Sequence, residues 1–258
     1  MRKSSFLTFL MLLIISTPVF GQAAGGQVIR KATKTTHAVV VDNAPRGKTS
    51  QAIDLGLPSG TKWAEWNIGA SSPEQYGNYY AWGEVSPKAD YSWATYFDSD
   101  SKGEHFKTYF IDNKNNNIGK YSVVMTNRDV AHVKWGGDWH IPTADQFGEL
   151  EKQCKWERHK LRGVWGVKVT GPNGNSIFLP AAGFMHRRTV NEKGETCIYW
   201  SGDLLSSERR KLFEEKKFDV YDYASGLGIC IPPNEDLLIY HAEIYRRRGH
   251  SIRAVKDR

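Results

Sequence analysis

The chain has 258 residues, with 35 Lys and Arg against 28 Asp and Glu, and its net charge is +7. Its three cysteines, Cys154, Cys197 and Cys230, are too few for a disulfide-held scaffold, so a hydrophobic core must hold the fold. Nine Trp, twelve Tyr, eleven Phe and 24 Gly favour strands and tight turns over a helical bundle.

The first residues have the pattern of a secretory signal peptide. Arg2 and Lys3 precede an apolar run over Phe6–Ile15, and small residues follow, with cleavage expected after Gly21 or Ala23. The run is shorter than the roughly 20 residues that span a bilayer, and no second long apolar run exists, so we expect no transmembrane segment. We therefore expect a secreted protein, and export argues against a nucleic-acid partner.

Three regions follow from composition: a signal peptide over 1–21, a polar linker over 22–50 and one folded domain over 51–256. The domain begins with two strand-like runs on either side of the turn at Pro58–Gly60. Ser72 has the features of a helix N-cap, which predicts a helix of one or two turns that ends at Gly77.

Residues 85–120 are polar and rich in turn formers, which indicates long loops. Thr143, with Gln146 three residues later, has the pattern of a capping box and predicts an amphipathic helix up to Cys154. Two strands joined by the turn "PNGN" form a predicted hairpin over 163–183. Later strands are expected at 197–201, 223–231 and 250–255, and the charged run 208–217 is interpreted as a solvated helix face.

Searches for catalytic and metal motifs exclude several chemistries. The chain has no Gly-x-Ser-x-Gly elbow, phosphate-binding Gly-rich loop or His-Glu-x-x-His motif. Asn234, Glu235 and Asp236 offer oxygen ligands for calcium but lack EF-hand spacing, so we expect no metal site and no cofactor, with calcium at these three residues as the alternative. Cys197 and Cys230 could form a disulfide, a redox pair or two inert thiols, and the disulfide is the favoured interpretation.

Recognition is predicted in 184–236, where the charged side chains are irregularly placed. Arg187 and Arg188 can pair bidentately with carboxylate or sulfate, so an acidic glycan is the expected ligand. The competing interpretation is that these charges only solvate a variable surface. The basic run 246–258 has the same two interpretations, an attraction for acidic glycans or a solubilising surface.

Six segments, in this order, resemble the Fibrobacter succinogenes major paralogous domain, a module of exported Bacteroidota proteins. They are "IDLGLPSGTKWA" (53–64), "NIGASSPEQYGNYYAWGE" (67–84), "DVAHVKWGGDWHIPT" (129–143), "VKVTGPNGNSIFLPAAG" (167–183), "IYWSG" (198–202) and "GHSIRAV" (249–255). The resemblance implies an α+β, C-type-lectin-like domain with short antiparallel sheets, two flanking helices and long loops, in which the chain ends meet as strands.

The tryptophans have expected structural roles. Trp66 stands where members often have Cys, so a disulfide from there to Cys154 is excluded. Large aromatics near element boundaries usually bury area, and the expected core tryptophans are Trp63, Trp82, Trp135, Trp139 and Trp200.

The expected function is a secreted, non-catalytic binding module whose partner is a glycan or a cell-surface protein, with the oligomeric state left open. The alternatives are a structural or adhesive envelope subunit and an enzyme that resembles the formylglycine-generating group. That enzyme needs a reactive cysteine pair or a copper site, and only Cys197 and Cys230 could serve.

Overall fold

A computed structural model describes residues 49–99, 122–219 and 222–258. The chain divides into two compact units, Met1–Asn43 and Ala44–Arg258, and the described residues all belong to the second. The expected signal peptide and nearly all of the expected linker therefore lie outside the described residues. Ser50 is buried and accepts a hydrogen bond from the Glu65 amide, so the folded domain includes the last linker residue. No helix among the described residues is long and apolar enough to cross a membrane.

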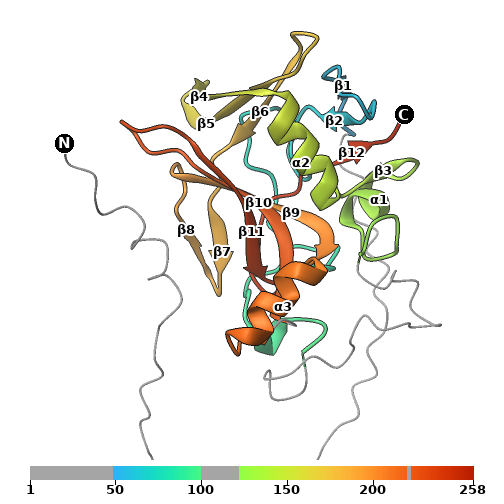
Figure 1. Ribbon diagram of the computed structural model, residues 1–258, viewed down its shortest axis with the longest axis vertical. Helices are drawn as coiled ribbons and strands as arrows, with labels where there is room; N and C mark the ends of the chain where they lie inside the picture. Colours follow the sequence, from blue (N-terminus) through green and yellow to red (C-terminus); the bar gives the residue numbers. More distant parts are fainter. Residues whose placement is uncertain (1–48, 100–121, 220–221) are drawn as a thin grey trace, which may run out of the picture. The chain divides into compact units, whose positions relative to one another are not determined.

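The described domain is α+β and consists mostly of small antiparallel sheets with few helices (Figure 1). One sheet joins the two ends of the domain. It contains β1 (Ala52–Asp54), β2 (Lys62–Ala64), β12 (Val255–Lys256) and β3 (Trp139–His140), in that order. Val255 lies opposite Trp63 on one side and His140 on the other, so the last strand fills the middle of the sheet. The expected meeting of the chain ends as strands is confirmed, although β12 is shorter than predicted.

The predicted hairpin over 163–183 is confirmed. β5 (Val164–Thr170) pairs with β6 (Ser176–Pro180), and β4 (Lys155–Leu161) adds on the other side of β5. The turn is closed by a hydrogen bond from the Gly171 amide to the Asn175 carbonyl. A Cβ atom on Gly171 would lie 2.1 Å from the Leu55 carbonyl oxygen, so only glycine lets the hairpin pack against the first strands.

The largest strands form the sheet β9 (Thr196–Leu204), β10 (Tyr223–Cys230) and β11 (Leu238–Tyr245), with β10 in the middle. A small hairpin, β7 (Phe184–His186) and β8 (Thr189–Asn191), lies beside it. Gly183 forms a parallel bridge with Cys197, so β7 starts beside the beginning of β9 and runs in the same direction. The strands predicted at 197–201 and 223–231 are thus confirmed.

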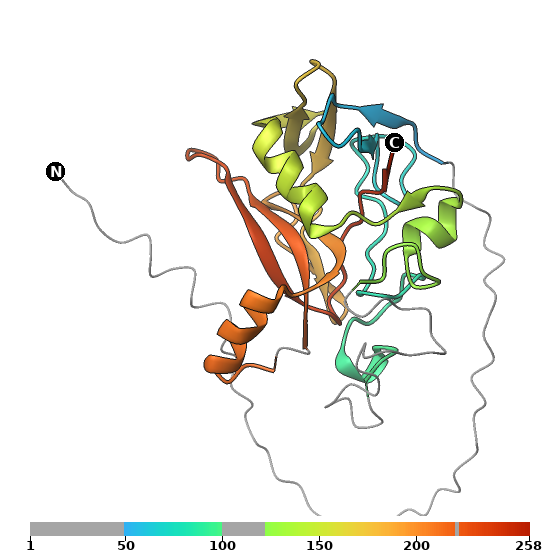
Figure 2. The same ribbon diagram turned by 45° about the vertical axis from the view of Figure 1, so that its right-hand side comes forward.

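Three α-helices are described: α1 (Val130–Trp135), α2 (Ala144–Gln153) and α3 (Ser207–Glu215). α2 is the predicted capped helix, and it contacts β9 and β10. α3 is the predicted solvated helix, and it contains no buried residue. Figures 1 and 2 show α2 across the sheet near one end and α3 at the other end.

The prediction of a helix after Ser72 is wrong. Residues 72–75 form a single turn, closed from the Gln75 amide to the Ser72 carbonyl at 3.2 Å. The Gln75 side chain accepts from the Ser71 amide at 2.9 Å, so the capping residues stabilise a turn instead of a helix. Gly77 follows at φ 73°, which ends any continuation within one turn.

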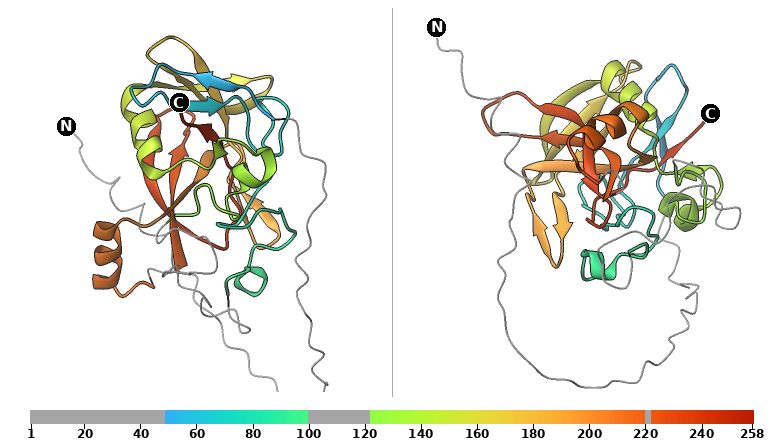
Figure 3. Two further views of the ribbon diagram at one scale, coloured as in Figure 1. Left: turned by 90° about the vertical axis from the view of Figure 1, so that its right-hand side faces the viewer. Right: turned by 60° about the horizontal axis from the view of Figure 1, so that its bottom comes forward.

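The segment "DVAHVKWGGDW" forms a helix that the sequence interpretation did not include. Asp129 caps α1 through bonds from the amides of Ala131 and His132, and it also accepts from the Ile141 amide. Gly136 and Gly137, both at positive φ, then turn the chain into β3. Figure 3 shows β3 with β12 beside the chain's end.

The five tryptophans expected in the core, Trp63, Trp82, Trp135, Trp139 and Trp200, are all buried. Trp135 and Trp139 pack edge to face at 5.0 Å, so the two tryptophans of "WGGDW" hold the fold together. Trp200 donates its indole N–H to the Tyr80 carbonyl at 2.7 Å, which satisfies its polar atom inside the core.

Candidate ligand-binding site

The sequence-predicted site residues lie at opposite ends of the region formed by the β9–β10–β11 sheet and the β7–β8 hairpin beside it. Arg187 and Arg188 form the turn between β7 and β8, whereas Asn234, Glu235 and Asp236 lie in the loop between β10 and β11. Because Cys230 pairs with Thr196 at the start of β9, that loop extends past the start of β9. β7 runs parallel to β9, away from the start of β9. The β7–β8 turn therefore lies toward the opposite end, where β9 finishes. The expected single site is therefore two separate surfaces.

The β10–β11 loop offers little that would bind a ligand. Asn234, Glu235 and Asp236 are exposed, and the loop carbonyl of Pro233 already accepts a bond from Arg158 at 3.1 Å. Among the described residues, no group of three or more His, Cys, Asp or Glu side chains is placed to hold a metal ion.

Arg188 and Arg187 have different surroundings. Arg188 forms a salt bridge with Asp90 at 3.4 Å, and its side chain is 80% exposed. Arg187 pairs through its backbone with Tyr91, and its side chain extends into solvent. The pairing brings the β7–β8 turn against the loop that contains Tyr91.

The same pairing brings Arg187 near three arginines that follow β11. Arg246 is fully buried, with its Nη1 atom 3.8 Å from Asp98, whereas Arg247 and Arg248 are half-buried. The backbone of Gly249 exchanges hydrogen bonds with Met185 at 2.7 and 2.9 Å, which holds the Arg246–Gly249 turn against β7.

Aromatic rings hold Arg247 and Arg248 in place. The Arg247 guanidinium carbon lies 4.9 Å from the centre of the Trp93 ring and 4.7 Å from that of Tyr245. Arg248 lies 5.1 Å from Phe184 and 5.2 Å from Tyr245. We call Arg187, Arg247, Arg248 and these three rings the arginine–aromatic cluster.

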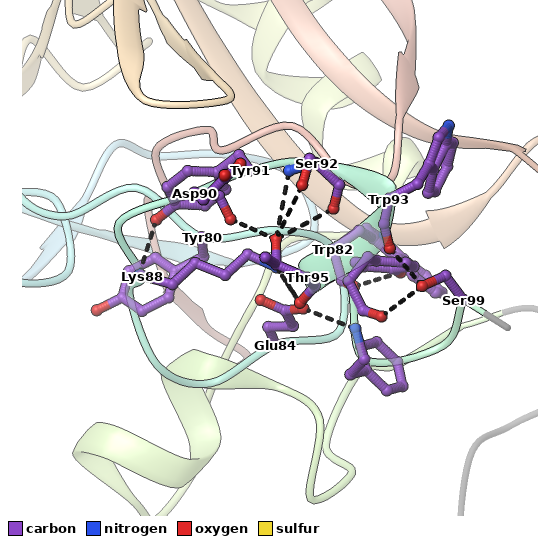
Figure 4. A network of polar contacts seen from close by, with 12 residues as sticks. Tyr80, Trp82, Glu84, Lys88, Asp90, Tyr91, Ser92, Trp93, Thr95 and Ser99 are labelled. Atoms are coloured by element: carbon purple, nitrogen blue, oxygen red, sulfur yellow. Dashed lines mark hydrogen bonds and ion pairs between the residues drawn. The ribbon is translucent and has the colours of Figure 1, made fainter. Parts of the chain in front are cut away.

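The loop that contains Trp93 is stiffened by its own polar contacts (Figure 4). Lys88 bonds the Glu84 carboxylate at 2.7 Å and the Thr95 carbonyl at 3.0 Å, and the Tyr91 hydroxyl donates to the Tyr79 carbonyl at 2.6 Å. Trp93 begins the short 3-10 helix η2 (Trp93–Thr95), and Figure 4 shows its ring pointing away from this network. The loop therefore presents Trp93 toward Tyr245 and Arg247.

The cluster is strongly positive. Burial lowers the pKa of Arg247, and the neighbouring Arg248 and Arg187 lower it further, against the opposing effects of Tyr245 and Asp222. Burial also lowers the pKa of His186, and Arg248, Arg247 and Arg187 add to the shift. An anion bound among these groups would relieve their mutual repulsion.

A separate groove of about 1090 Å³ lies between α2 and α3 over the sheet. Its charged side chains are largely engaged within the protein: Arg209 pairs with Glu243, His241 lies 3.6 Å from Glu151, and Asp203 accepts from the Ala144 amide at 2.7 Å. The arginine–aromatic cluster is the better candidate for a ligand-binding site. Two of its guanidinium groups contain buried nitrogens that have no hydrogen-bond acceptor in the described part of the chain.

The expected disulfide between Cys197 and Cys230 is not formed, because all three cysteines are free. Cys197 lies opposite Ile229 and Cys230 lies opposite Thr196, so the two side chains point to opposite faces of the sheet. Burial raises the pKa of both thiols, most strongly for the fully buried Cys197. As placed, they are neutral thiols at neutral pH and not a reactive pair.

No family model, no curated protein and no solved structure matches this chain. The candidate site therefore depends on the residues and their geometry. The sequence predicted Arg187 as a site residue but not Arg247 or Arg248. These two belong to the basic run "RRRGH", in which no local pattern indicates which arginines are buried. The positively charged cluster can hold an anion, and its rings lie close to both guanidinium groups.

Proposed function

We propose that the protein is an exported, non-catalytic binding module of the cell surface or extracellular space, and that it recognises an acidic glycan. One observation carries the proposal: Arg247 and Arg248 stack on aromatic rings beside the exposed Arg187, and each contains a buried nitrogen without a partner in the described residues. Such groups favour an oxygen-rich anionic ligand. The signal-peptide pattern at the N-terminus supports export.

We also propose that the domain belongs to the Fibrobacter succinogenes major paralogous family and has its C-type-lectin-like fold. The six ordered segments support this assignment, as does the pairing of β12 with β2, which the resemblance implies. A lectin-like fold alone does not define a ligand, so the glycan proposal depends on the cluster.

The two alternatives have less support from the geometry. An enzyme of the formylglycine-generating kind needs a reactive thiol pair, and Cys197 and Cys230 face opposite sides of their sheet. An adhesive subunit needs a continuous apolar surface. The exposed large hydrophobics among the described residues are scattered over different elements: Met125, Val133, Val190, Phe218 and Leu238.

A glycan array tests the proposal, with the purified protein applied with and without calcium. We expect retention on glycans that bear carboxylate or sulfate, weakened by added salt. The double variant Arg247→Ala, Arg248→Ala should lose this retention. The control is Arg158→Ala, because Arg158 also stacks on a ring, that of Trp165 at 3.9 Å, but lies on β4. Retention of neutral glycans only, or equal retention by the double variant, contradicts the proposal.

Export is tested separately by N-terminal sequencing of secreted protein. The mature chain should begin at Gln22 or within a few residues of it. Secreted protein that still carries Met1 contradicts the expected cleavage.

A further inference from the structure

The buried nitrogens of Arg247 and Arg248 belong to two guanidinium groups that lie close to aromatic rings. Rings lie against Arg247 at 4.7 and 4.9 Å and against Arg248 at 5.1 and 5.2 Å. Guanidinium N–H bonds lie in the plane of the group, so an acceptor must approach these nitrogens from the edge of the group, and an aromatic ring cannot take that role. Nη1 of Arg247 and Nε of Arg248 are buried and have no hydrogen-bond partner within the described residues.

Two other arginines that are buried or lie over a ring donate hydrogen bonds within the described residues. Arg253 donates four hydrogen bonds to oxygens of the core, and Arg158 donates to the Pro233 carbonyl. A buried nitrogen without a partner is not unique to the cluster, because Nε of Arg158 is also buried and has no partner among the described residues. Arg247 and Arg248 differ because two such nitrogens belong to neighbouring guanidinium groups beside the same Tyr245 ring, and Arg187 adds a third positive charge near them.

Nearby carboxylates moderate the charge without filling this position. Asp222 opposes the lowering of the pKa of Arg247, and Glu192 does so for Arg248. Neither carboxylate bonds the two buried nitrogens. The cluster keeps an excess of positive charge, to which Arg187 contributes from the β7–β8 turn.

The backbone around the cluster is fixed closely. A Cβ atom on Gly249 would lie 2.6 Å from the Tyr91 ring and 2.9 Å from the Met185 Cβ atom, so three segments meet there without space for a side chain. The arginines therefore project from a turn that is held on two sides. A site with so little freedom loses less entropy when a ligand binds.

We propose that Arg247 and Arg248, assisted by Arg187, form a pocket for a single oxyanion, the carboxylate or sulfate group of a sugar. The proposal rests on the acidic-glycan function and names the group that is recognised. Two guanidinium edges suit a group with two or more oxygens in one plane, so charge alone is not sufficient for binding.

Titration with small probes tests the pocket, followed through the arginine Nε–Hε resonances and by calorimetry. The probes are methyl glucuronide, its neutral counterpart methyl glucoside, inorganic sulfate and inorganic phosphate. We expect the glucuronide or sulfate to bind and to shift the Arg248 Nε resonance, whereas the glucoside has no effect. The arm that binds more tightly identifies carboxylate or sulfate as the preferred group.

The variants Arg247→Lys and Arg248→Lys keep the charge and remove the planar fork, and each should weaken binding about tenfold or more. Arg158→Lys is the matched control and should bind as the original protein does. Arg187→Asn should weaken binding less than the two Lys variants do. Its control is Arg162→Asn, because both arginines lie in hairpin turns at positive φ, which Asn tolerates.

The outcomes separate this inference from the proposed function. Undiminished binding by the folded Lys variants overturns the pocket, and so does glycan retention on the array without any anion binding at these arginines. Anion binding that requires both forks supports the pocket even when no glycan on the array is retained, in which case only the glycan function fails. A folded spectrum for each variant shows that a loss of binding is not a loss of structure.

Discussion

Arg253 is a charge placed inside the protein, and its acceptors explain how the fold accommodates it. Its side chain is fully buried. It donates to Asn67 Oδ1 at 2.9 Å and to the carbonyls of Ala64, Glu65 and Phe178 at 3.0, 2.7 and 2.7 Å. These acceptors come from β2, the segment after it and β6, so one side chain joins two sheets. Buried polar groups persist when they are bonded in this way.

Replacement of Arg253 should be costly. Arg253→Met leaves three buried oxygens and the part-buried Glu65 carbonyl without their donor, and we expect a loss of at least about 3 kcal/mol in the free energy of unfolding. Arg253→Lys should also destabilise, because an ammonium group lacks the planar fork that reaches both sheets. Urea unfolding measures both variants. Lys211→Ala on the exposed helix α3 is the control, expected within about 0.5 kcal/mol. An Arg253→Met protein as stable as the original would show that the hydrogen bonds of Arg253 do not stabilise the fold.

His250 provides a pH-dependent contribution to stability. It is fully buried, lies 5.6 Å from the Phe184 ring and 4.9 Å from the Trp200 ring, and both its nitrogens lack partners among the described residues. Burial lowers its pKa well below the usual value of 6.5, and Arg248 lowers it further. Below pH 6.5 the unfolded chain therefore binds a proton that the folded chain excludes. Stability from this residue is present above pH 6.5 and is lost as the pH falls.

The variant His250→Phe should remove this effect while it keeps the aromatic packing. Between pH 6.5 and 5, the original protein should lose up to about 1.4 kcal/mol more per pH unit than the variant. Urea unfolding at several pH values measures the two profiles. Above pH 7.5, where the imidazole is neutral in both states, the profiles should run parallel. Parallel profiles across the acidic range as well would contradict the assignment.

The arginines also show what the sequence could not reveal. "RRRGHSIRAVKDR" has the composition of a solvated basic run, yet Arg246 and Arg253 are fully buried and Arg247 and Arg248 are half-buried. Their burial depends on Asp98, Phe178 and Trp93, which lie far away in the sequence. The tryptophans were predictable because large aromatics are usually buried in any fold.

At the scale of elements, capping and turn patterns in the sequence predicted a helix or hairpin correctly where enough residues followed to form it. The α2 cap and the β5–β6 turn are set by residues next to one another, so the sequence contains them completely. The same capping pattern at Ser72 failed, because Gly77 leaves too few residues to repay the cost of starting a helix. Pairings across the chain, such as Arg187 with Tyr91, carry no local signal, and the site could not be assembled without them.

The helix caps of α2 and α3 offer a matched comparison. Thr143 accepts a bond from the Gln146 amide and completes a capping box, and α2 buries Phe147 and Leu150. Ser206 caps α3 through the Arg209 amide, but α3 buries nothing. Thr143→Ala should therefore cost about 1 kcal/mol of global stability. Ser206→Ala should cost clearly less, since α3 can fray without unfolding the core. Thermal unfolding of both variants checks the order, and equal losses would contradict it.

At the scale of the whole domain, the last strand closes a sheet that starts some 200 residues earlier in the numbering. β12 has two residues, yet it pairs with β2 on one side and β3 on the other, and Ala254 accepts from the Ala64 amide at 2.9 Å. Val255 and Ala254 are completely buried, whereas Asp257 and Arg258 are exposed. The boundary of the core therefore falls between Lys256 and Asp257.

Two truncations test this boundary. Removal of Asp257 and Arg258 deletes exposed residues, the bond from Gln146 to Asp257 and the 3.3 Å contact of the Asp257 carboxylate with His140 Nε2. Because the Asp257 side chain is largely exposed, we expect a loss of about 1 kcal/mol or less. Removal of Ala254–Arg258 deletes the strand that joins β2 to β3, and it leaves both with unpaired backbone groups beside the buried Trp63. The shorter chain should lose cooperative unfolding, as measured by urea titration of tryptophan fluorescence and by circular dichroism. A cooperative transition near that of the complete chain would show that β12 is dispensable and that β1, β2 and β3 are held by other contacts.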